Sequence, residues 1–380
     1  MIIAKLLLHA GLGLFGAIAG CSVVNITSIP PQAMSENSPT SAPELVIDGL
    51  EHPWGMAWLP DQSLLITERP GRLRLVRQGK LEPRPIAGLP PILVLGQGGL
   101  LDIALHPQFE QNRWLYFTYT HGTPQANRTR VARAKFDGKT LTNLEVIFEV
   151  PQTKEGGQHF GSRLLWLPDQ TLLVSIGDGG NPPVRLANDL IRKQAQNRRS
   201  ALGKIIRLKD DGTVPANNPL VKDPQALPQI WSYGHRNIQG LAYDSVGKRV
   251  WATEHGSRGG DELNLIEPGQ NYGWPLVTHS EEYFGGQISN LRSAPGKQDP
   301  KLVWQRAIAP SGLAVVNGVI YGGGLVSGDI HRLEPNQAGQ IIKQSRIRIG
   351  QRVRDVKFHQ NALYVLTDSA QGQLLRLSLK

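Results

Sequence analysis

The amino-acid sequence predicts an all-β fold, a six-bladed β-propeller of four-stranded antiparallel sheets. Two observations support this prediction. The 380-residue chain contains 42 glycines and 27 prolines and few stretches of helical periodicity, which favours many short strands joined by turns. In addition, one hairpin pattern recurs six times along the chain.

Each copy of the pattern is an apolar pair, a turn containing Pro, Asp, Asn or Gly, and four or five apolar or β-branched residues that end at a polar one. The copies lie at residues 58–68, 104–119, 166–178, 243–254, 314–323 and 358–368. Near identity of the first and third, WLPDQSLL and WLPDQTLL, argues against the alternative, a β-sandwich with similar hairpins. Further short strands, which bring each unit to about four, are expected at residues 73–76, 204–208, 330–333 and 374–377.

The amino terminus has the pattern of an export signal. Residues 1–20 carry an early Lys5 and then an apolar run, and the following IAGC segment resembles the bacterial lipobox, which ends in a lipidated cysteine. Cys21 is the only cysteine, so an internal disulfide is excluded. We expect residues 21–43 to be a flexible tether and residues 44–380 to be the catalytic propeller, held by lipid in the bacterial envelope on the periplasmic side. The alternative is an incidental cysteine after an ordinary signal.

The net charge of +10 suggests an anionic partner. The longest basic region, residues 343–354, alternates arginine with isoleucine or valine, as a strand with one solvated face does. No basic run is interleaved with stacking aromatics, so we expect no nucleic-acid binding. A small anionic cofactor or a basic surface explains the charge better.

Glycine-flanked polar residues adjoin several of the repeats. Because loops from one face of every blade converge in a propeller, we expect these side chains to lie together; they are Gln97, His159, Asp178, Arg236, Asn237, Arg352 and Arg354. The chain has no GxSxG elbow, HExxH motif or phosphate loop, so serine hydrolase, zinc protease and nucleotidase readings lack their residues.

The residue types of this set suggest removal of a hydroxyl proton with electron transfer to a bound cofactor. A histidine can act as general base near neutral pH, and arginines can hold carboxylates in paired hydrogen bonds. Protein side chains cannot accept a hydride, so the electrons must pass to a bound cofactor. The alternatives remain open: His159, like His52 and His255, could be structural, Asp178 could cap a turn, and the two carboxyl-terminal arginines could be strand-face charges.

Residues 251–274, WATEHGSRGGDELNLIEPGQNYGW, combine a short strand, a glycine-rich loop and acidic residues. Glycines around Gly256 allow main-chain carbonyls to turn toward a ligand, and Asp261, Glu262 and Tyr272 add oxygen atoms. Hard oxygen donors without cysteine or a histidine pair suit Ca²⁺. The alternative is a solvated hairpin turn.

Six motifs, in this order, resemble the soluble PQQ-dependent glucose and aldose sugar dehydrogenases, the glucose/sorbosone dehydrogenase family. They are GQGGLLDIALHPQF, QHFGSRL, IGDGG, GHRNIQGLAYD, EHGSRGGDELNLIEPGQNYGWP and RVRDV. The resemblance runs from about residue 50 to the carboxyl end. It implies a six-bladed propeller that binds PQQ and Ca²⁺, oxidises an aldose at C1 to the lactone, and passes electrons to an unknown acceptor.

The resemblance also implies roles for single residues. His159 stands where the family has the base that takes the C1 hydroxyl proton as hydride passes to PQQ, and Asp178 matches an acid that supports it. Arg236 and Asn237 match PQQ contacts, with the arginine near the carbonyl oxygen that gains charge. Gln97 matches a residue of the sugar and cofactor pocket.

Further matches concern carboxylates and metal. Arg352 and Arg354 match binders of the cofactor carboxylates. Main-chain carbonyls at Gly256 and Ser257 match holders of the PQQ-bound calcium, and a separate structural calcium has ligands that match Glu262 and Tyr272.

One departure from the family pattern is a missing lysine after the fifth repeat, where residues 324–328 read GLVSG. Loss of that cation should weaken tricarboxylate binding by a few kcal/mol unless another group replaces it. The departure favours an alternative, a non-catalytic, calcium-stabilised binding module in the cell envelope. A calcium-dependent propeller lactonase is a third reading, which leaves the motifs around His159 and Arg236 unexplained.

Overall fold

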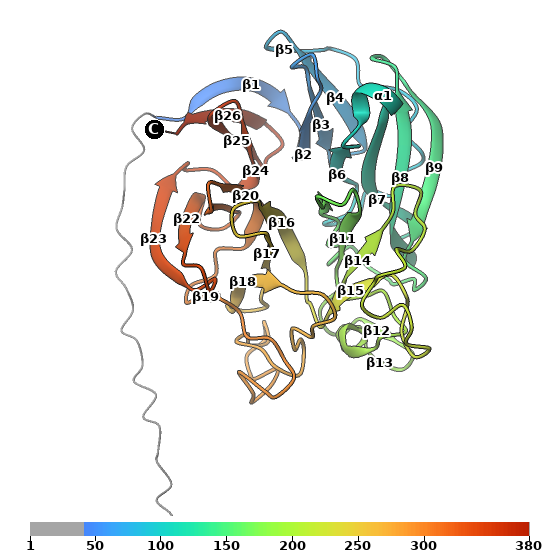
Figure 1. Cartoon of the computed structure of the whole chain (residues 1–380), viewed down its shortest axis with the longest axis vertical. Helices are drawn as coiled ribbons and strands as arrows, with labels where there is room; N and C mark the ends of the chain where they lie inside the picture. Colours follow the sequence, from blue (N-terminus) through green and yellow to red (C-terminus); the bar gives the residue numbers. More distant parts are fainter. Residues whose placement is uncertain (1–41, 380) are drawn as a thin grey trace, which may run out of the picture. The chain divides into compact units, whose positions relative to one another are not determined.

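The computed structural model describes residues 42–379, which form six antiparallel four-stranded sheets arranged as the blades of a propeller (Figure 1). This confirms the predicted fold class. All six predicted hairpins are present, each as the innermost and second strand of one blade. The predicted signal and Cys21 lie outside the described residues, as does nearly all of the predicted tether.

Five blades take their four strands in chain order, from the innermost strand outwards. Blade 1 is β2 (Pro53–Trp58), β3 (Leu64–Glu68), β4 (Arg72–Arg77) and β5 (Lys80–Leu81). Blade 2 is β6 (Leu100–Leu105), β7 (Trp114–Thr123), β8 (Ala126–Phe136) and β9 (Leu141–Glu149). Blade 3 is β10 (Leu164–Trp166), β11 (Leu172–Ile176), β14 (Lys204–Leu208) and β15 (Ile230–Tyr233). Blade 4 is β16 (Ile238–Asp244), β17 (Arg249–Glu254), β18 (Asp261–Ile266) and β19 (Leu302–Trp304). Blade 5 is β20 (Pro310–Val316), β21 (Val319–Gly324), β22 (Asp329–Pro335) and β23 (Ile341–Arg348).

Blade 6 closes the ring by joining the two ends of the described chain. It contains β24 (Val353–His359), β25 (Ala362–Thr367) and β26 (Gly372–Ser378), and its outermost strand is β1 (Glu44–Leu50), which pairs antiparallel with β26. Outside the blades lie α1 (Phe109–Asn112), the hairpin β12 (Arg185–Leu186) and β13 (Asp189–Leu190), and the 3₁₀ helix η1 (Ile191–Gln196). Within residues 42–379 no helix is long and apolar enough to cross a bilayer.

The hydrophobic core is divided among the blade interfaces. Second strands such as β3 (LLITE) and β11 (LLVSI) are buried along their whole length, because a blade on each side covers both faces. One apolar cluster fills each of the six interfaces; between blades 1 and 2, for example, Leu65 and Leu75 share a cluster with Phe117. Packing between sheets, without disulfides, therefore holds the ring together.

Hydroxyl groups add a polar connection between successive blades. Thr67, Thr118, Ser175 and Thr253, all on second strands, each donate a hydrogen bond to a main-chain carbonyl at or beside the innermost strand of the next blade, at 2.5 to 3.2 Å. Each hydroxyl thus finds a hydrogen-bond partner inside the ring. These short polar side chains link the second strand of one blade to the innermost strand of the next.

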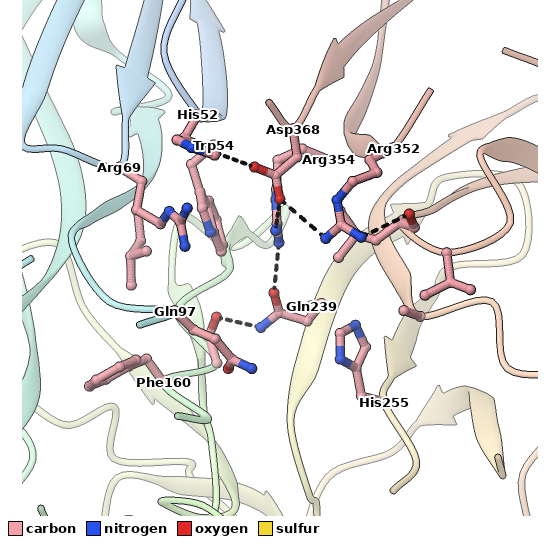
Figure 2. Close-up of a pocket in the computed structure, with 15 residues that line it drawn as sticks. His52, Trp54, Arg69, Gln97, Phe160, Gln239, His255, Arg352, Arg354 and Asp368 are labelled. Atoms are coloured by element: carbon pink, nitrogen blue, oxygen red, sulfur yellow. Dashed lines mark hydrogen bonds and ion pairs between the residues drawn. The ribbon is translucent and has the colours of Figure 1, made fainter. Parts of the chain in front are cut away.

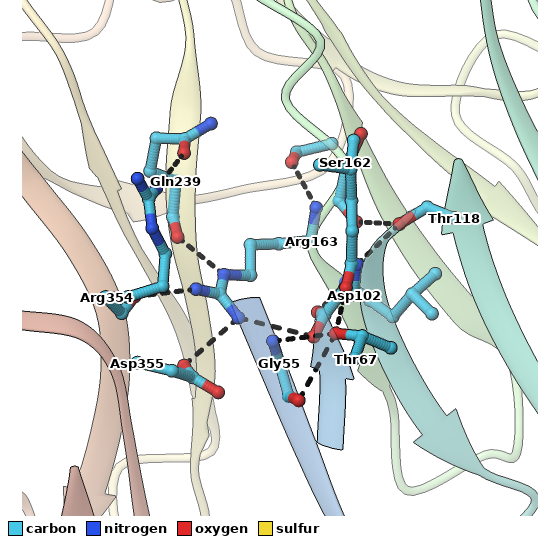
Figure 3. Close-up of polar contacts among 12 residues, drawn as sticks. Gly55, Thr67, Asp102, Thr118, Ser162, Arg163, Gln239, Arg354 and Asp355 are labelled. Atoms are coloured by element: carbon cyan, nitrogen blue, oxygen red, sulfur yellow. Dashed lines mark hydrogen bonds and ion pairs between the residues drawn. The ribbon is translucent and has the colours of Figure 1, made fainter. Parts of the chain in front are cut away.

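Arg163, which directly precedes β10, lies buried at the centre of the ring (Figure 3). Its Nη1 is 3.3 Å from Asp102 Oδ1 and 3.0 Å from Asp355 Oδ1, and both carboxylates are fully buried. Its Nε donates to the carbonyl of Gln239 and its Nη2 to that of Arg354. One guanidinium therefore joins strands β6, β16 and β24 to the start of β10.

Replacing Arg163 by methionine should destabilise the fold strongly, because two buried carboxylates would lose their cation. We expect a loss of roughly 3 to 5 kcal/mol in the free energy of unfolding, seen as a lower denaturant midpoint. Arg376→Met, which removes a surface ion pair with Glu44, is the matched control and should leave the midpoint nearly unchanged. Equal midpoints for the two variants would contradict this role of Arg163.

Candidate functional site

Two adjoining cavities open where the loops of all six blades converge. They are lined by residues just before the innermost strands and just after the second strands, since an antiparallel hairpin begins and ends on the same face. The first cavity encloses about 400 Å³ and the second about 360 Å³. Gln97 and His255 line both cavities, so the two form one continuous site.

The first cavity is basic (Figure 2). Arg352 and Arg354 enter from the start of β24, and Arg69 enters from the end of β3. Asp368 is the one carboxylate on the wall; its Oδ2 is 2.5 Å from Arg354 Nη2 and 3.6 Å from Arg352 Nη2. Its Oδ1 is 2.9 Å from His52 Nδ1. Three arginines against one aspartate favour an anionic ligand that carries carboxylates.

Apolar side chains complete the first cavity. Trp54 and Phe160 provide aromatic surfaces, and Leu325 and Val326 occupy the position where the family resemblance predicts a lysine. Val326 is 64 % exposed, and no cation from residues 324–328 lines this wall. The combination of flat aromatic rings with separated arginines fits a planar polycarboxylate such as PQQ.

His159 lines the second cavity and is paired with Asp178, which is buried behind it and does not reach the cavity wall. Nδ1 of the imidazole is 2.6 Å from Asp178 Oδ1, and since a carboxylate only accepts, Nδ1 carries the hydrogen. Nε2 is then an acceptor, which agrees with its position 3.4 Å from the amide nitrogen of Asn181. Trp274 Nε1 donates to the other oxygen of Asp178 at 2.8 Å and fixes the carboxylate.

The imidazole of His159 is neutral near pH 7. Burial lowers the pKa of His159 below its ordinary 6.5, and the charge of Arg236 lowers it further, whereas Asp178 opposes both effects. A neutral imidazole with a lone pair on Nε2, held by a carboxylate on the opposite nitrogen, can accept a proton from a hydroxyl group in the cavity.

The backbone holds His159 in an uncommon conformation. Its φ is +49°, and its main-chain N–H donates to Oε1 of Gln97 at 2.9 Å. Gly177 makes this possible, because a Cβ there would lie 2.1 Å from the carbonyl oxygen of His159. A non-glycine residue in the left-handed region costs free energy and is most often retained at functional sites.

Arg236 and Asn237 differ in their placement. The guanidinium of Arg236 lines the second cavity, donates to Asn181 Oδ1 at 2.7 Å and to the carbonyl of His255 at 3.1 Å, and its Nε is buried without a hydrogen-bond partner. Asn237 lines neither cavity; its Oδ1 accepts the main-chain N–H of Gly161 at 3.1 Å. The structure therefore brings Arg236, but not Asn237, to the cavity wall.

A third, small cavity of about 10 Å³, called the acidic cavity here, has two glutamates on its wall and is also lined by Arg236 and His255. Glu254, Glu262, Gly256 and Tyr272 line it. Burial, together with the charge of Glu254, raises the pKa of Glu262 to about 8, as expected for two carboxylates that share a site. The volume admits a single water molecule or ion.

This acidic cavity fits a small cation of the calcium type. A Cβ at Gly256 would lie 1.9 Å from the carbonyl oxygen of Gly259, so only glycine permits the tight loop there. The hydroxyl of Tyr272 is committed to the main chain of Leu265 and Glu267, which leaves its carbonyl oxygen as the possible ligand. Ser257 lies beside this cavity but does not line it.

No group of three or more His, Cys, Asp or Glu side chains in the described part of the chain could hold a metal by itself. A cation in the acidic cavity would therefore need main-chain oxygens beside the two carboxylates. Such a mixed oxygen set is what Ca²⁺ accepts and what zinc or iron sites generally lack.

Several residues of the site were not among the predicted set, namely His52, Arg69, Gln239, His255 and Asp368. Arg69, His255 and Asp368 each follow directly after a second strand. A search for polar residues directly after each second strand of the predicted hairpins would have identified these three. His255 was interpreted as structural, and it does bond the Pro310 carbonyl at 2.7 Å while lining both cavities.

The entrance of the second cavity has an aromatic edge. Tyr283 and Phe284 line it from the loop between β18 and β19, and Phe284 is 93 % exposed. An ion pair of 2.6 Å between Glu282 and Arg192 ties this loop to η1. Exposed aromatic side chains at the entrance of a cavity suit the apolar faces of a ring-shaped substrate.

Comparisons with known proteins agree with this arrangement. A family model described as Glucose / Sorbosone dehydrogenase matches residues 50–376. The uncharacterised Synechocystis protein slr1608 is 60 % identical and matches over 94 % of this chain and 92 % of its own length. The aldose sugar dehydrogenase YliI of Escherichia coli is 36 % identical over 88 % of this chain and 92 % of its own. The PQQ-bound form of aldose sugar dehydrogenase from Streptomyces coelicolor is 29 % identical, with a TM-score of 0.73 over 89 % of this chain and 97 % of its own.

Proposed function

The chain belongs to the glucose/sorbosone dehydrogenase family, and we propose that it oxidises an aldose at C1 to the lactone with PQQ and Ca²⁺. Its relatives support sugar dehydrogenase activity, and the PQQ-bound neighbour supports the choice of cofactor. The observation that carries the proposal is the buried pair of His159 and Asp178 beside an arginine-lined cavity.

His159 acts as the general base in this proposal. Its Nε2 takes the proton of the C1 hydroxyl while Asp178 stabilises the imidazolium that forms. Bound PQQ would supply the acceptor for the hydride that leaves C1, so that the C1–H and O–H bonds break as the C1 carbonyl bond forms. Arg236 would stabilise negative charge that develops beside the second cavity.

The first cavity supplies the cofactor site. Arg352 and Arg354 would hold carboxylates of PQQ, Trp54 and Phe160 would pack against its ring system, and Gln97 stands between this cavity and the base. Asn237 would act indirectly, through its bond to Gly161, and not by direct contact.

Sugar-dependent dye reduction with added PQQ and Ca²⁺ tests the proposal. His159→Ala should abolish turnover, and Asp178→Asn should lower kcat by about 10²- to 10⁴-fold, because the amide no longer selects the active tautomer. His359→Ala, at a half-buried histidine that stacks on Trp58 at the end of β24 and lines neither cavity, is the control and should keep full activity. A folded wild-type protein that neither binds PQQ nor reduces the dye would instead support the binding-module alternative.

The pH profile gives an independent test of the base. Because the pKa of His159 is lowered by burial and by Arg236, the acidic limb of kcat/KM should lie below pH 6.5. Arg236→Gln should move this limb to higher pH, and Lys154→Met should move it less, since the Lys154 charge is a weaker cause of the lowered pKa. Lys193→Met, at an exposed lysine paired with Asp189, should leave the limb in place. A limb that moves to lower pH in Arg236→Gln contradicts the assignment.

We place one Ca²⁺ in the acidic cavity formed by Glu254, Glu262, Gly256 and Tyr272. The resemblance assigns Gly256 and Ser257 to a separate, PQQ-bound calcium, and that second site stays a proposal that depends on the cofactor.

Calcium should raise the melting temperature of chelator-treated protein, because a cation between two buried carboxylates binds the folded state only. Glu262→Gln should lose most of this increase, whereas Glu281→Gln, at an exposed carboxylate, should keep it. Differential scanning fluorimetry with Ca²⁺ and Mg²⁺ measures both. The same calcium response in wild type and Glu262→Gln would place the ion elsewhere.

Export and anchoring through Cys21 remain part of the proposal, with an electron acceptor in the envelope. Mass spectrometry of the mature protein from a bacterial membrane fraction would test them, since a lipidated Cys21 would be the first residue.

A further inference from the structure

The first cavity lacks the lysine that the family resemblance predicts, so another residue would have to supply that positive charge. The family resemblance predicts a lysine on the wall formed by residues 324–328, where this chain presents Leu325 and Val326. Figure 2 shows the guanidinium of Arg69 on the side of the cavity opposite Arg352. Arg69, a cation from blade 1, thus lines the cavity although the resemblance gives it no role.

Arg69 differs from the other two arginines of this cavity in its partners. Arg352 and Arg354 share the carboxylate of Asp368, which partly neutralises them. The hydrogen bond that Arg69 makes through its side chain is from Nη1 to the carbonyl of Gly96, at 2.6 Å. Among residues 42–379 no carboxylate lies within ion-pair distance of Arg69. Its charge still acts on Asp368 from farther away: burial raises the pKa of Asp368, whereas Arg354 lowers it and Arg69 adds to the lowering, so that this pKa lies below its ordinary value. Nη2 and Nε of Arg69 are thus left for a ligand.

The neighbouring carboxylate cannot neutralise Arg69. Glu68 precedes it on β3, and because side chains alternate along a strand it points away from the cavity. Its oxygens already bind Arg72 at 2.6 Å and the main-chain N–H of Glu51 at 2.8 Å. The charge of Arg69 acts across the cavity instead: burial lowers the pKa of Arg354, and the charges of Arg163 and Arg69 add to that effect.

We propose that Arg69 takes the place of the missing family lysine and binds a carboxylate of the cofactor from the blade 1 side of the first cavity. The inference rests on the proposed function, because it assumes that PQQ is the ligand. Nη1 is held by Gly96, so Nη2 and Nε are the donors directed to the carboxylate. The absence of the family lysine at residues 324–328 then moves the positive charge to another wall of the cavity and does not remove it.

Calorimetric titration of PQQ in the presence of Ca²⁺ and without sugar tests the inference independently of turnover. Arg69→Gln should raise the Kd for PQQ by roughly 10- to 100-fold, the effect of losing one charge-assisted hydrogen bond. Arg69→Lys should recover part of the affinity because it keeps the charge. Arg185→Gln is the matched control, since this exposed arginine also donates to a carbonyl, that of Asn188, and should leave the Kd unchanged.

A rescue variant separates charge from loop anchoring. Val326 is 64 % exposed on the cavity wall, so Val326→Lys requires no repacking and restores a cation where the family has one. In the Arg69→Gln background it should lower the Kd again by at least several-fold. If Arg69 only anchored Gly96, Val326→Lys would lower the Kd by the same factor in the wild type and in Arg69→Gln, whereas a shared role in charge predicts the larger effect in Arg69→Gln.

The outcomes distinguish a failure of the proposed function from a failure of the role assigned to Arg69. A folded wild-type protein that does not bind PQQ overturns the proposed function, and the assignment of Arg69 with it. Wild-type binding with an unchanged Kd in Arg69→Gln, or a failed rescue by Val326→Lys at an unchanged melting temperature, overturns the assignment of Arg69 alone.

Discussion

A single buried guanidinium, that of Arg163, is the interaction on which the rest of the propeller depends. It stacks 4.1 Å over the ring of Trp54, pairs with Asp102 and Asp355, and binds main-chain carbonyls on β16 and β24 (Figure 3). Blades 1, 2, 4 and 6 therefore meet at a side chain from blade 3. Leaving two carboxylates buried without this cation would lower the free energy of unfolding by several kcal/mol. The innermost strands can therefore separate only if water reaches the whole cluster.

The cluster around Arg163 also fixes side chains that line the first cavity. Arg163 bonds the carbonyls of Gln239 and Arg354, whose side chains line the first cavity and bond each other at 3.3 Å. Arg354 is therefore fixed from both sides, by Arg163 through its main chain and by Asp368 through its guanidinium. Charges held in this way need little reorganisation when an anion enters, which is the condition for strong electrostatic binding.

Local patterns in the sequence were enough to predict the hairpins and the glycine-flanked residues before the innermost strands, because both depend on neighbours in the chain. Asp178, which follows β11, was predicted, but Arg69 and Asp368 were missed for a physical reason: no glycines mark them, and they look like ordinary turn residues until the antiparallel return places them on the same face. Local sequence patterns also could not predict which hydrogen-bond partner each side chain has. The hydroxyl of Tyr272 bonds the main chain, and the amide of Asn237 supports Gly161, although both residues were correctly sought near the site.

His159 is held between an acidic and a basic cavity through main-chain bonds on both sides. On the acidic side, Glu254 accepts the main-chain N–H of Arg236, whose carbonyl accepts that of Asp178, the partner of the imidazole. On the basic side, Arg69 bonds the carbonyl of Gly96, and the adjacent Gln97 accepts the N–H of His159. These links hold His159 through main-chain groups. The acidic cavity therefore needs only negative charge and the basic cavity only positive charge, and the side chain that carries the positive charge can belong to any blade that lines the basic cavity. Under the proposal for Arg69, the position of His159 does not depend on whether the cation of the first cavity stands on blade 5 or on blade 1.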